Sequence, residues 1–375
     1  MTTKRDAIKI SAVGDLGLIG KISEYMDKKG PDYPFRHVVR ELNTADIVFG
    51  NLEMPFCDDA TSNLRCYQSK EFFHTLQAAK SLRSAGFSIL SLANNHIMEC
   101  GREGLEKTVE VLSMNSIKFV GAGKNLKESR KPAIFDVHET KIGFLAYTTK
   151  SKDSASFSNA GSAPIEIELI IDDVINLKKQ CDFVIVSLHF GFMYIEIPSP
   201  DDVKLCHKII DNGADVILGH HPHVLQGIER YKNGLICYSL GEFVFDRMAG
   251  VRFVKLGSEN RRESLILNLY LKKKQPIQYD LVPTFLSDNY QVEIQTGEPG
   301  LRILKKIDRL SARIASTEDF YEEAGANLVS YEISGLFYHI KRRNFSYLLL
   351  KARNIRLKHL KIFLGFLKRV SKKAL

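Results

Sequence analysis

Short apolar runs alternate along this chain with segments of helical periodicity, and a polar turn follows each run. We predict buried strands at residues 8–13, 45–49, 87–92, 183–188 and 216–218. Helical spacing occurs between them at residues 70–83, 104–112, 167–179 and 201–211. Strands that alternate with helices in this way predict an α/β fold with a substantially parallel sheet.

Local signals mark several ends of these elements. Gly86 follows the predicted helix at 70–83 and is typical of a helix C-terminus. Ser199-Pro200 precedes the predicted helix at 201–211 and has the form of an N-cap followed by proline at the first helical position. Further strands, of antiparallel type, are predicted at residues 133–137, 141–148, 235–239 and 264–271. The first two of these flank His138-Glu139-Thr140, which predicts a hairpin.

The positive charge of the chain is concentrated near its C-terminus. The net charge is +9, and residues 301–375 contain 17 Lys and Arg against 6 Asp and Glu. After residue 332 there are 12 basic residues and no acidic one, while the first 300 residues are nearly neutral. Because the pattern turns helical and basic after Asn289, we predict a main domain at 1–289 and a basic, mainly helical extension at 290–375.

Composition and cysteine usage narrow the class of protein. An apolar fraction of 44% and a charged fraction of 26% are ordinary for a globular chain and exclude wholesale disorder. The six cysteines form no C-x-x-C pair, which favours a reducing compartment without a disulfide framework. The first 15 residues have no apolar core, and no apolar run approaches the ~20 residues of a membrane span. We therefore expect a cytoplasmic protein without a signal peptide.

Six polar clusters directly follow apolar strands. They are Gly14-Asp15, Asn51-Leu52-Glu53, Asn94-Asn95-His96, His189-Phe190-Gly191, Gly219-His220-His221-Pro222-His223 and Gly241-Glu242-Phe243. Ligands of open α/β sheets bind where the carboxyl ends of strands converge. Carboxylates, an amide oxygen and imidazoles form a mixed ligand set that suits Mn, Fe, Zn or Mg, and the lack of thiolates argues against a zinc finger.

Each cluster alone also has an ordinary structural explanation. A lone aspartate after a strand is usually a turn or capping residue, and His189 alone is more typical of a hydrogen-bonded core histidine. Three imidazoles in one loop at residues 220–223 have no such explanation. The conjunction of all six clusters favours a metal site.

In this order the six clusters resemble the CapA family of capsule or poly-gamma-glutamate biosynthesis proteins. The resemblance extends to Met54-Pro55, Ala93, Val224, Ser239-Leu240 and Val244-Phe245 beside them. That family is related to calcineurin-like metallophosphoesterases. The resemblance covers residues 8–246 and implies a four-layer α/β/β/α sandwich with its site at the edge of the sheets.

The resemblance also implies roles for individual residues. Two divalent ions would be held by Asp15 on the first metal, Glu53 as the bridging carboxylate, Asn95 on the second metal, and His189, His221 and His223, with His220 as a substitute for either of the last two. His96 would protonate a leaving group. Two such cations can generate a hydroxide and stabilise charge on a phosphoryl group.

Several positions depart from the family pattern. Gly17 stands where general metallophosphoesterases have a histidine, and Met193 where this family has an acidic residue, with Glu196 the nearest acidic candidate. Glu99 replaces an aspartate and Glu242 an asparagine. These changes either retune the pocket or weaken catalysis.

The C-terminal extension contains one amphipathic pattern. Leu357, Leu360, Leu364 and Leu367 follow helical spacing among lysines and arginines. The segment is explained by a helix docked on the main domain or by peripheral contact with an anionic membrane surface. Nucleic acid is the least favoured partner, because no recognised nucleic-acid motif accompanies the charge. Membrane contact would place the protein at the inner face of the membrane.

Two functions remain after these considerations. The leading one is a metal-dependent hydrolase of the metallophosphoesterase type that acts on an anionic surface polymer, its lipid-linked precursor or a phosphate ester. The alternative is a non-catalytic, metal-holding accessory subunit of a capsule-polymer synthase or exporter. The loops at 151–162 and 248–262 are expected to set selectivity near the mouth of the site.

Overall fold

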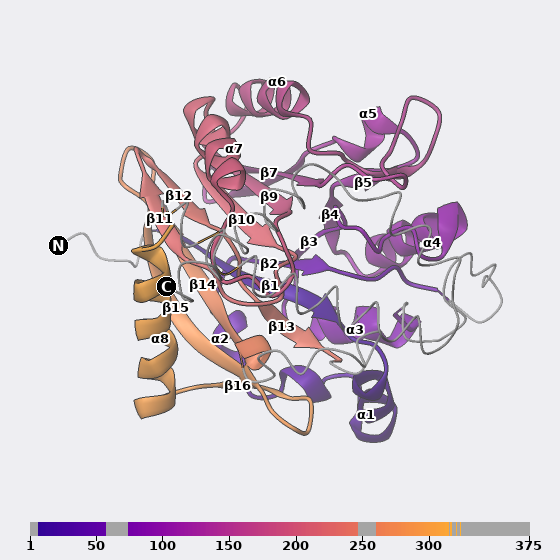
Figure 1. Cartoon of the computed structure of the whole chain (residues 1–375). Helices are drawn as coiled ribbons and strands as arrows, with labels where there is room; N and C mark the ends of the chain where they lie inside the picture. The colour runs from indigo at the N-terminus through magenta and orange to yellow at the C-terminus, as the bar shows by residue number, and fades with distance from the viewer. Residues whose placement is uncertain are drawn as a thin grey trace, which may run out of the picture.

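Two β-sheets lie face to face and helices cover the outer face of each, as the computed structural model in Figure 1 shows. The structure describes residues 7–57, 74–246 and 260–314, with single residues at 316, 320 and 323. This arrangement confirms the four-layer α/β/β/α sandwich expected from the sequence.

The first sheet is built around a parallel centre. Its order is β16 (Val292–Ile294), β15 (Gln278–Leu286), β14 (Glu263–Leu271), β1 (Ile8–Gly17), β2 (Ile47–Leu52), β3 (Ile89–Ser91) and β4 (Lys118–Val120), and β13 (Glu242–Phe245) also pairs with β1. Strands β1 to β4 and β13 run parallel, whereas β14, β15 and β16 form antiparallel pairs.

The second sheet is also mixed. Its order is β11 (Ile228–Tyr231), β12 (Gly234–Cys237), β10 (Val216–His220), β9 (Phe183–His189), β7 (Thr140–Thr148) and β6 (Ala133–Val137). The strand predicted at 235–239 is β12, which pairs antiparallel with β11 but parallel with β10. A small ladder joins β5 (Ala122–Gly123) to β8 (Gly161–Ser162).

Helices bury their apolar faces on the outer side of each sheet. The first sheet is covered by α1 (Lys21–Lys29), α2 (Val39–Leu42), α3 (Leu76–Ser84), α4 (Gly101–Met114) and the short 3₁₀ turn Tyr33–Phe35. The second is covered by α6 (Ile167–Lys178) and α7 (Pro200–Asp211). Two further elements are α5 (Leu126–Ser129) beside β5 and a 3₁₀ turn at Asn260–Arg262.

The space between the sheets is almost wholly apolar. Ile10 and Ala12 of β1 face into it, while Val13 and Leu16 of the same strand face the helices. Burial on both faces explains why these strands are nearly continuous apolar runs. Polar residues that these strands carry at their carboxyl ends are consequently held on a rigid support.

Local sequence signals fixed several elements as predicted. The hairpin forms between β6 and β7, with positive φ at both His138 (47°) and Glu139 (60°). Ser199 and Asp202 form a reciprocal capping box at the start of α7, with Pro200 in the first turn. Gly86, at φ 99°, follows the end of α3.

The segment after the boundary predicted near residue 290 begins in contact with the main domain. β16 is the edge strand of the first sheet, and α8 (Gly297–Ser311) inserts Ile303 and Ile307 into the core between the sheets. The amphipathic segment at 357–370 and most of the loop at 248–262 lie outside the described residues, as do residues 70–73 of the first predicted helix. The basic extension thus stays a prediction. Within the described part of the chain, no helix is long and apolar enough to cross a membrane.

Candidate metal centre

The polar clusters meet where parallel strands of both sheets end. In the first sheet Asp15 of β1 is the ladder partner of Asn51 on one side and of Glu242 on the other. In the second sheet His220 of β10 is paired with His189 of β9. All five side chains are buried, with exposed fractions of 2% or less.

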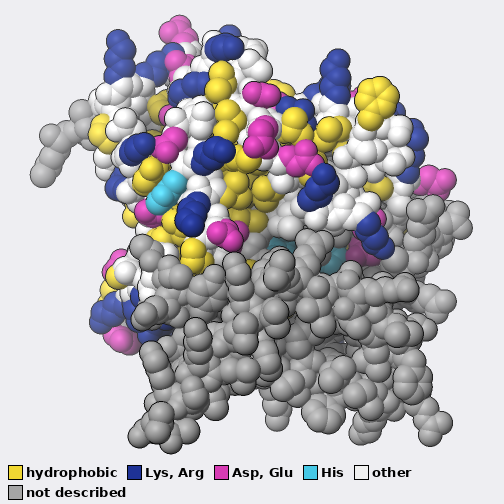
Figure 2. All heavy atoms as spheres, turned by 45° about the horizontal axis from the view of Figure 1, so that its top comes forward, with side chains coloured by type: hydrophobic (Ala, Val, Ile, Leu, Met, Phe, Trp, Pro, Cys, Tyr) yellow, Lys and Arg dark blue, Asp and Glu magenta, His cyan; other side chains and the backbone are white. Residues whose placement is uncertain are grey.

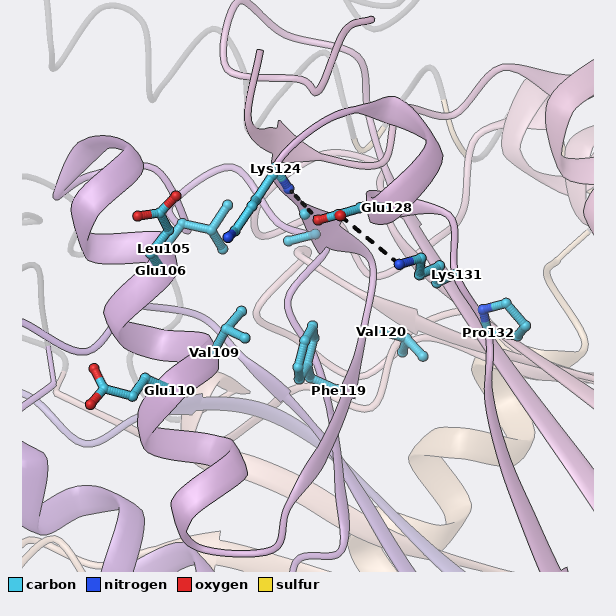
Figure 3. Close-up of a pocket in the computed structure, with 12 residues that line it drawn as sticks. Leu105, Glu106, Val109, Glu110, Phe119, Val120, Lys124, Glu128, Lys131 and Pro132 are labelled. Atoms are coloured by element: carbon cyan, nitrogen blue, oxygen red, sulfur yellow. Dashed lines mark hydrogen bonds and ion pairs between the residues drawn. The ribbon is translucent and has the colours of Figure 1, made fainter. Parts of the chain in front are cut away.

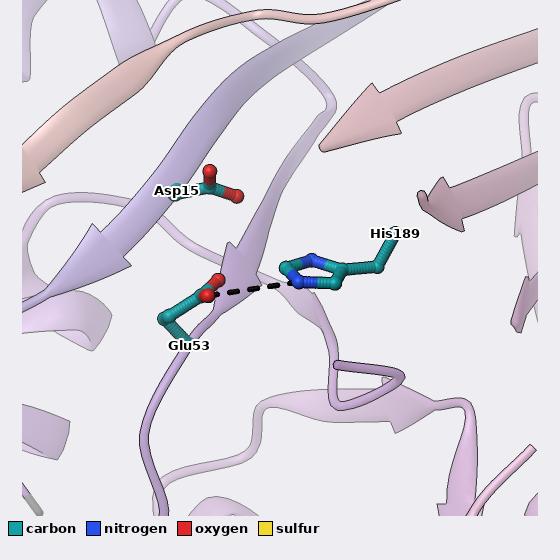
Figure 4. A group of neighbouring side chains, drawn as sticks. All are labelled: Asp15, Glu53 and His189. Carbon is teal, nitrogen blue, oxygen red and sulfur yellow. Dashed lines mark ion pairs between the residues drawn. The ribbon is translucent and has the colours of Figure 1, made fainter. Parts of the chain in front are cut away.

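Asn51 joins the two carboxylates at the centre of this cluster. Its side-chain amide donates to Asp15 Oδ1 at 2.8 Å and to Glu53 Oε2 at 2.7 Å. Glu53 Oε1 lies 3.6 Å from His189 Nε2, and Figure 4 shows these side chains turned toward one another. Asp15, Glu53 and His189 offer ligand atoms that all lie within 4.8 Å of one another.

His189 connects this group to two further predicted ligands. Its Nε2 lies 2.8 Å from Asn95 Oδ1 and 3.1 Å from His221 Nδ1. The His189 and His221 rings are 4.7 Å apart between centroids. A ring nitrogen, an amide oxygen and a second ring nitrogen therefore converge beside Glu53.

His220 and His223 also approach Asp15. His220 Nδ1 lies 3.4 Å from Asp15 Oδ1, and His223 Nδ1 lies 3.3 Å from Asp15 Oδ2. The loop reaches this arrangement with positive φ at His221 (95°) and His223 (58°), a conformation that costs about 1–3 kcal/mol per residue outside glycine. Such strain persists where the surrounding structure holds it, and it concentrates at functional sites.

Burial and mutual contact shift the pKa values in opposite directions. Burial alone would raise the pKa of Asp15, but contact with the His220 and His223 imidazoles holds it well below its usual range. Burial raises the pKa of Glu53 well above its usual range, and the charge of Asp15 raises it further. Burial lowers the pKa of His189, helped by His221.

His223 behaves differently from His189. Burial disfavours its charged form, yet the carboxylates of Asp15, Glu242 and Glu53 raise the pKa of His223 to about 9. In the absence of a cation this imidazole is therefore protonated at neutral pH, and it neutralises part of an excess of negative charge. That excess is what a bound cation would neutralise instead.

Unsatisfied polar atoms collect in the same place. Among the described residues, buried atoms without a hydrogen-bond partner include Asn51 Oδ1, Glu53 Oε1, Glu242 Oε2, His223 Nδ1 and both ring nitrogens of His220. Buried polar atoms are nearly always hydrogen-bonded, so a local concentration of exceptions requires an explanation such as an ion. The donor set of carboxylates, amide and imidazoles fits a divalent metal.

His96 directly follows the predicted ligand Asn95 in the chain. Its Nδ1 is 2.9 Å from Glu99 Oε1, and its backbone N–H donates to Asn94 Oδ1. A cavity of about 790 Å³ begins at Asn95 and Glu99 and extends along the loop that contains Lys152. Figure 2 shows basic and acidic side chains interspersed over the face that carries α6 and α7.

A second cavity, of about 450 Å³, is separate from the metal centre. It lies between α4 and β4, with Val109 and Phe119 in its wall and charged side chains such as Glu110 and Lys131 around it (Figure 3). None of the predicted site residues lines it.

The structure thus brings all six predicted metal ligands together, and it adds residues that the sequence did not single out for a role. Asn51 was noted only as part of a motif, although it bridges two carboxylates. Arg261, in a predicted surface loop, is 8% exposed and donates to Glu242 Oε1 at 2.8 Å. No sequence signal identified Arg261. Glu196, the nearest acidic candidate after Met193, is paired instead with Lys306 at 2.7 Å.

Comparisons with known proteins give a matching family model, similar curated sequences and a structural neighbour. Residues 9–247 match the family model described as bacterial capsule synthesis protein PGA_cap. The capsule biosynthesis protein CapA of Bacillus anthracis is 30% identical over 79% of this chain and 70% of its own length. The PGA biosynthesis protein CapA of Bacillus subtilis is 32% identical over 75% and 72%. A phosphatase structure from Mycoplasma pneumoniae aligns with a TM-score of 0.46 and 15% identity over 80% of this chain and 97% of that one.

Proposed function

The chain belongs to the bacterial capsule synthesis protein family, and from this membership we propose that it is a metal-dependent hydrolase acting in the synthesis of an anionic surface polymer. The substrate would be the polymer, its lipid-linked precursor or a phosphate ester. Membership in the family confirms the resemblance expected from the sequence.

The observation that carries this proposal is the group of buried, unsatisfied polar atoms around Asp15. Two subsets of ligands are supported by the distances. Asp15 and His223 would hold one ion, and Asn95, His189 and His221 the other, with Glu53 between them. A pair of divalent ions would supply an activated water and a positive charge for the developing negative charge on the substrate.

The remaining groups would orient and transfer protons. The amide of Asn51 holds the carboxylates of Asp15 and Glu53 in fixed rotamers. Glu99 lies beside Nδ1 of His96 and would orient that ring as the proton donor to a leaving group at the edge of the cavity. The replacement of a family aspartate by Glu99 therefore leaves a carboxylate in contact with His96.

The test is hydrolysis by the purified full chain in the presence of Mn²⁺, measured with p-nitrophenyl phosphate and with γ-linked glutamate oligomers. We expect turnover of at least one substrate, its loss on treatment with EDTA and its return on addition of Mn²⁺. The double variant Asp15→Asn/Glu53→Gln serves as the inactive control. If the metal-loaded protein hydrolyses neither substrate, the accessory role expected as the alternative replaces the enzyme role.

A further inference from the structure

Glu242 is a third buried carboxylate at the metal centre, and no role has been given to it above. It lies on β13, is 1% exposed and is the ladder partner of Asp15. The backbones that carry the two residues come unusually close, because a Cβ atom on Gly14 would lie 2.0 Å from the carbonyl oxygen of Gly241. The chain thus brings Glu242 beside Asp15 through a contact that only glycine permits.

The two carboxylate oxygens of Glu242 have different surroundings. Oε1 accepts a hydrogen bond from Arg261 Nη2 at 2.8 Å, and the Arg261 guanidinium is held 4.7 Å above the Tyr194 ring. Oε2 is buried and has no hydrogen-bond partner among the described residues. Arg261 therefore fixes the orientation of the carboxylate and leaves one oxygen available to another ligand.

The Asp15 end of the centre lacks a side chain that related sites would provide. The residue two positions after Asp15 is Gly17, and a Cβ atom there would lie 2.6 Å from the Phe245 ring, so the position is closed to larger residues. Met193 offers no oxygen, and the Glu196 carboxylate is held by Lys306. Of the ligands assigned above, only Asp15, Glu53 and His223 remain at this end.

The distances around His223 fit a common cation. His223 Nδ1 lies 3.3 Å from Asp15 Oδ2 and 3.4 Å from Glu242 Oε1. Adjacent ligand atoms that are each bonded to one ion at ~2.1 Å lie roughly 3.0–3.4 Å apart. Glu242 Oε1, the oxygen bonded to Arg261, therefore lies at ligand spacing from His223. The unpartnered Oε2 of the same carboxylate is the second oxygen open to an ion shared by Asp15 and His223.

We propose that Glu242 is a ligand of the cation held by Asp15 and His223, and that Arg261 is the positioning residue for its carboxylate. Glu242 thus replaces the ligand that neither Gly17 nor Met193 supplies. An additional carboxylate favours a harder cation such as Mn²⁺ at this end of the centre. The inference rests on the proposed metal-dependent function.

The competing explanation is a purely structural ion pair between Glu242 and Arg261. Removal of either partner of a buried pair leaves an uncompensated charge and lowers stability, whereas removal of both is often tolerated. The two explanations consequently predict different metal affinities for variants that lack Glu242. A structural ion pair also predicts that loss of Glu242 and loss of Arg261 have equal effects, whereas a ligand role for Glu242 does not.

The experiment is calorimetric titration of Mn²⁺ into the metal-free full chain, with thermal melts of each variant. The variants are Glu242→Gln, Arg261→Gln and the double variant Glu242→Gln/Arg261→Gln, and Glu229→Gln is the matched control for loss of a partly buried glutamate on another strand. We expect two Mn²⁺ sites in the wild type. One of them should weaken most in both variants that lack Glu242, and by ~10-fold in Arg261→Gln, which removes an outer partner of the ligand and keeps the carboxylate.

Other outcomes overturn the inference. If both variants that lack Glu242 bind Mn²⁺ with wild-type affinity, and the two single variants lose the same thermal stability, the Glu242–Arg261 ion pair is structural. If Glu242→Gln and the double variant fail to fold, Glu242→Asp retains the charge and retracts the carboxylate. It should weaken one site if Glu242 is a ligand, and unchanged affinity refutes the proposal. A wild-type chain that binds no Mn²⁺ refutes the proposed metal-dependent function itself.

Discussion

Two clusters in this molecule combine a glutamate with histidine, and they differ in how completely hydrogen bonds satisfy them. On β11, Glu229 lies 2.9 and 3.1 Å from His207 Nε2 and accepts a hydrogen bond from the Tyr238 hydroxyl at 2.7 Å. The His207 ring stacks on Tyr231 with centroids 3.7 Å apart. Glu229, His207 and Tyr238 each have a hydrogen-bond partner in the protein.

The cluster at the ends of β1 and β9 also places a glutamate beside a histidine, but its hydrogen bonding is incomplete. Glu53 is fully buried, yet its Oε1 has no hydrogen-bond partner among the described residues. Glu242 Oε2 and both ring nitrogens of His220 likewise have no hydrogen-bond partner among the described residues. The comparison teaches that a local concentration of buried, unsatisfied polar atoms marks the candidate site, since a glutamate beside a histidine occurs in both clusters.

The largest expected effect is loss of metal from Glu53→Ala. As the proposed bridging carboxylate, Glu53 would neutralise two cations, whereas Asp15 would serve one, so Glu53→Ala should remove more metal than Asp15→Ala. Elemental analysis after dialysis measures the content. Glu229→Ala should retain wild-type metal content, and equal content in the Glu53 and Asp15 variants would contradict the bridging role.

The next largest effect is on turnover in His96→Ala. A general acid contributes about 10²–10⁴-fold to rate, so kcat should fall by this factor on substrates with a poor leaving group. The metal content should remain that of the wild type, because His96 contacts Glu99 at the edge of the cluster. Loss of metal from this variant would show that His96 is a metal ligand and not the proton donor.

The metal-free protein should lose stability at alkaline pH through His223. Its pKa is about 9, above the ordinary value of 6.5, so its contribution is fully present below about pH 6.5 and is lost as the pH rises through 9. The loss should reach roughly 3 kcal/mol in the free energy of unfolding. Urea denaturation of wild type and His223→Gln after EDTA treatment measures the difference, and parallel pH profiles would refute the prediction. Saturation with Mn²⁺ should abolish the effect.

The smallest effect is expected in the satisfied cluster. Glu229→Gln should lower the free energy of unfolding by about 1 kcal/mol, because it weakens hydrogen bonds to His207 and Tyr238 without leaving a charge unpaired. Thermal and urea denaturation measure this change. A loss of Mn²⁺ affinity in Glu229→Gln would show that the two clusters are not independent.

Much of the fold was predictable because its signals are local. Ser199, Pro200 and Asp202 start a helix through contacts within four residues, and the 133–148 hairpin depends on a single turn. Seven strands were not predicted, since short or partly polar segments depend on partners far away in the sequence for their conformation; they are β4, β5, β8, β11, β13, β15 and β16. β2 likewise begins at Ile47 and extends to Leu52, beyond the apolar run at 45–49 that predicted it.

The sequence by itself determined which residue types would stand at the ends of the strands. An apolar run followed by Asp15, Glu53, His189 or His220 is readable in one dimension, because the carboxyl ends of parallel strands must share an edge. Only the tertiary structure decided which side chains meet across that edge. Asn51 touches Asp15 through strand register, and Arg261 reaches Glu242 from a loop 19 residues further along the chain. Strand register and side-chain packing between distant segments set these contacts, and neither produces a periodic pattern in the sequence.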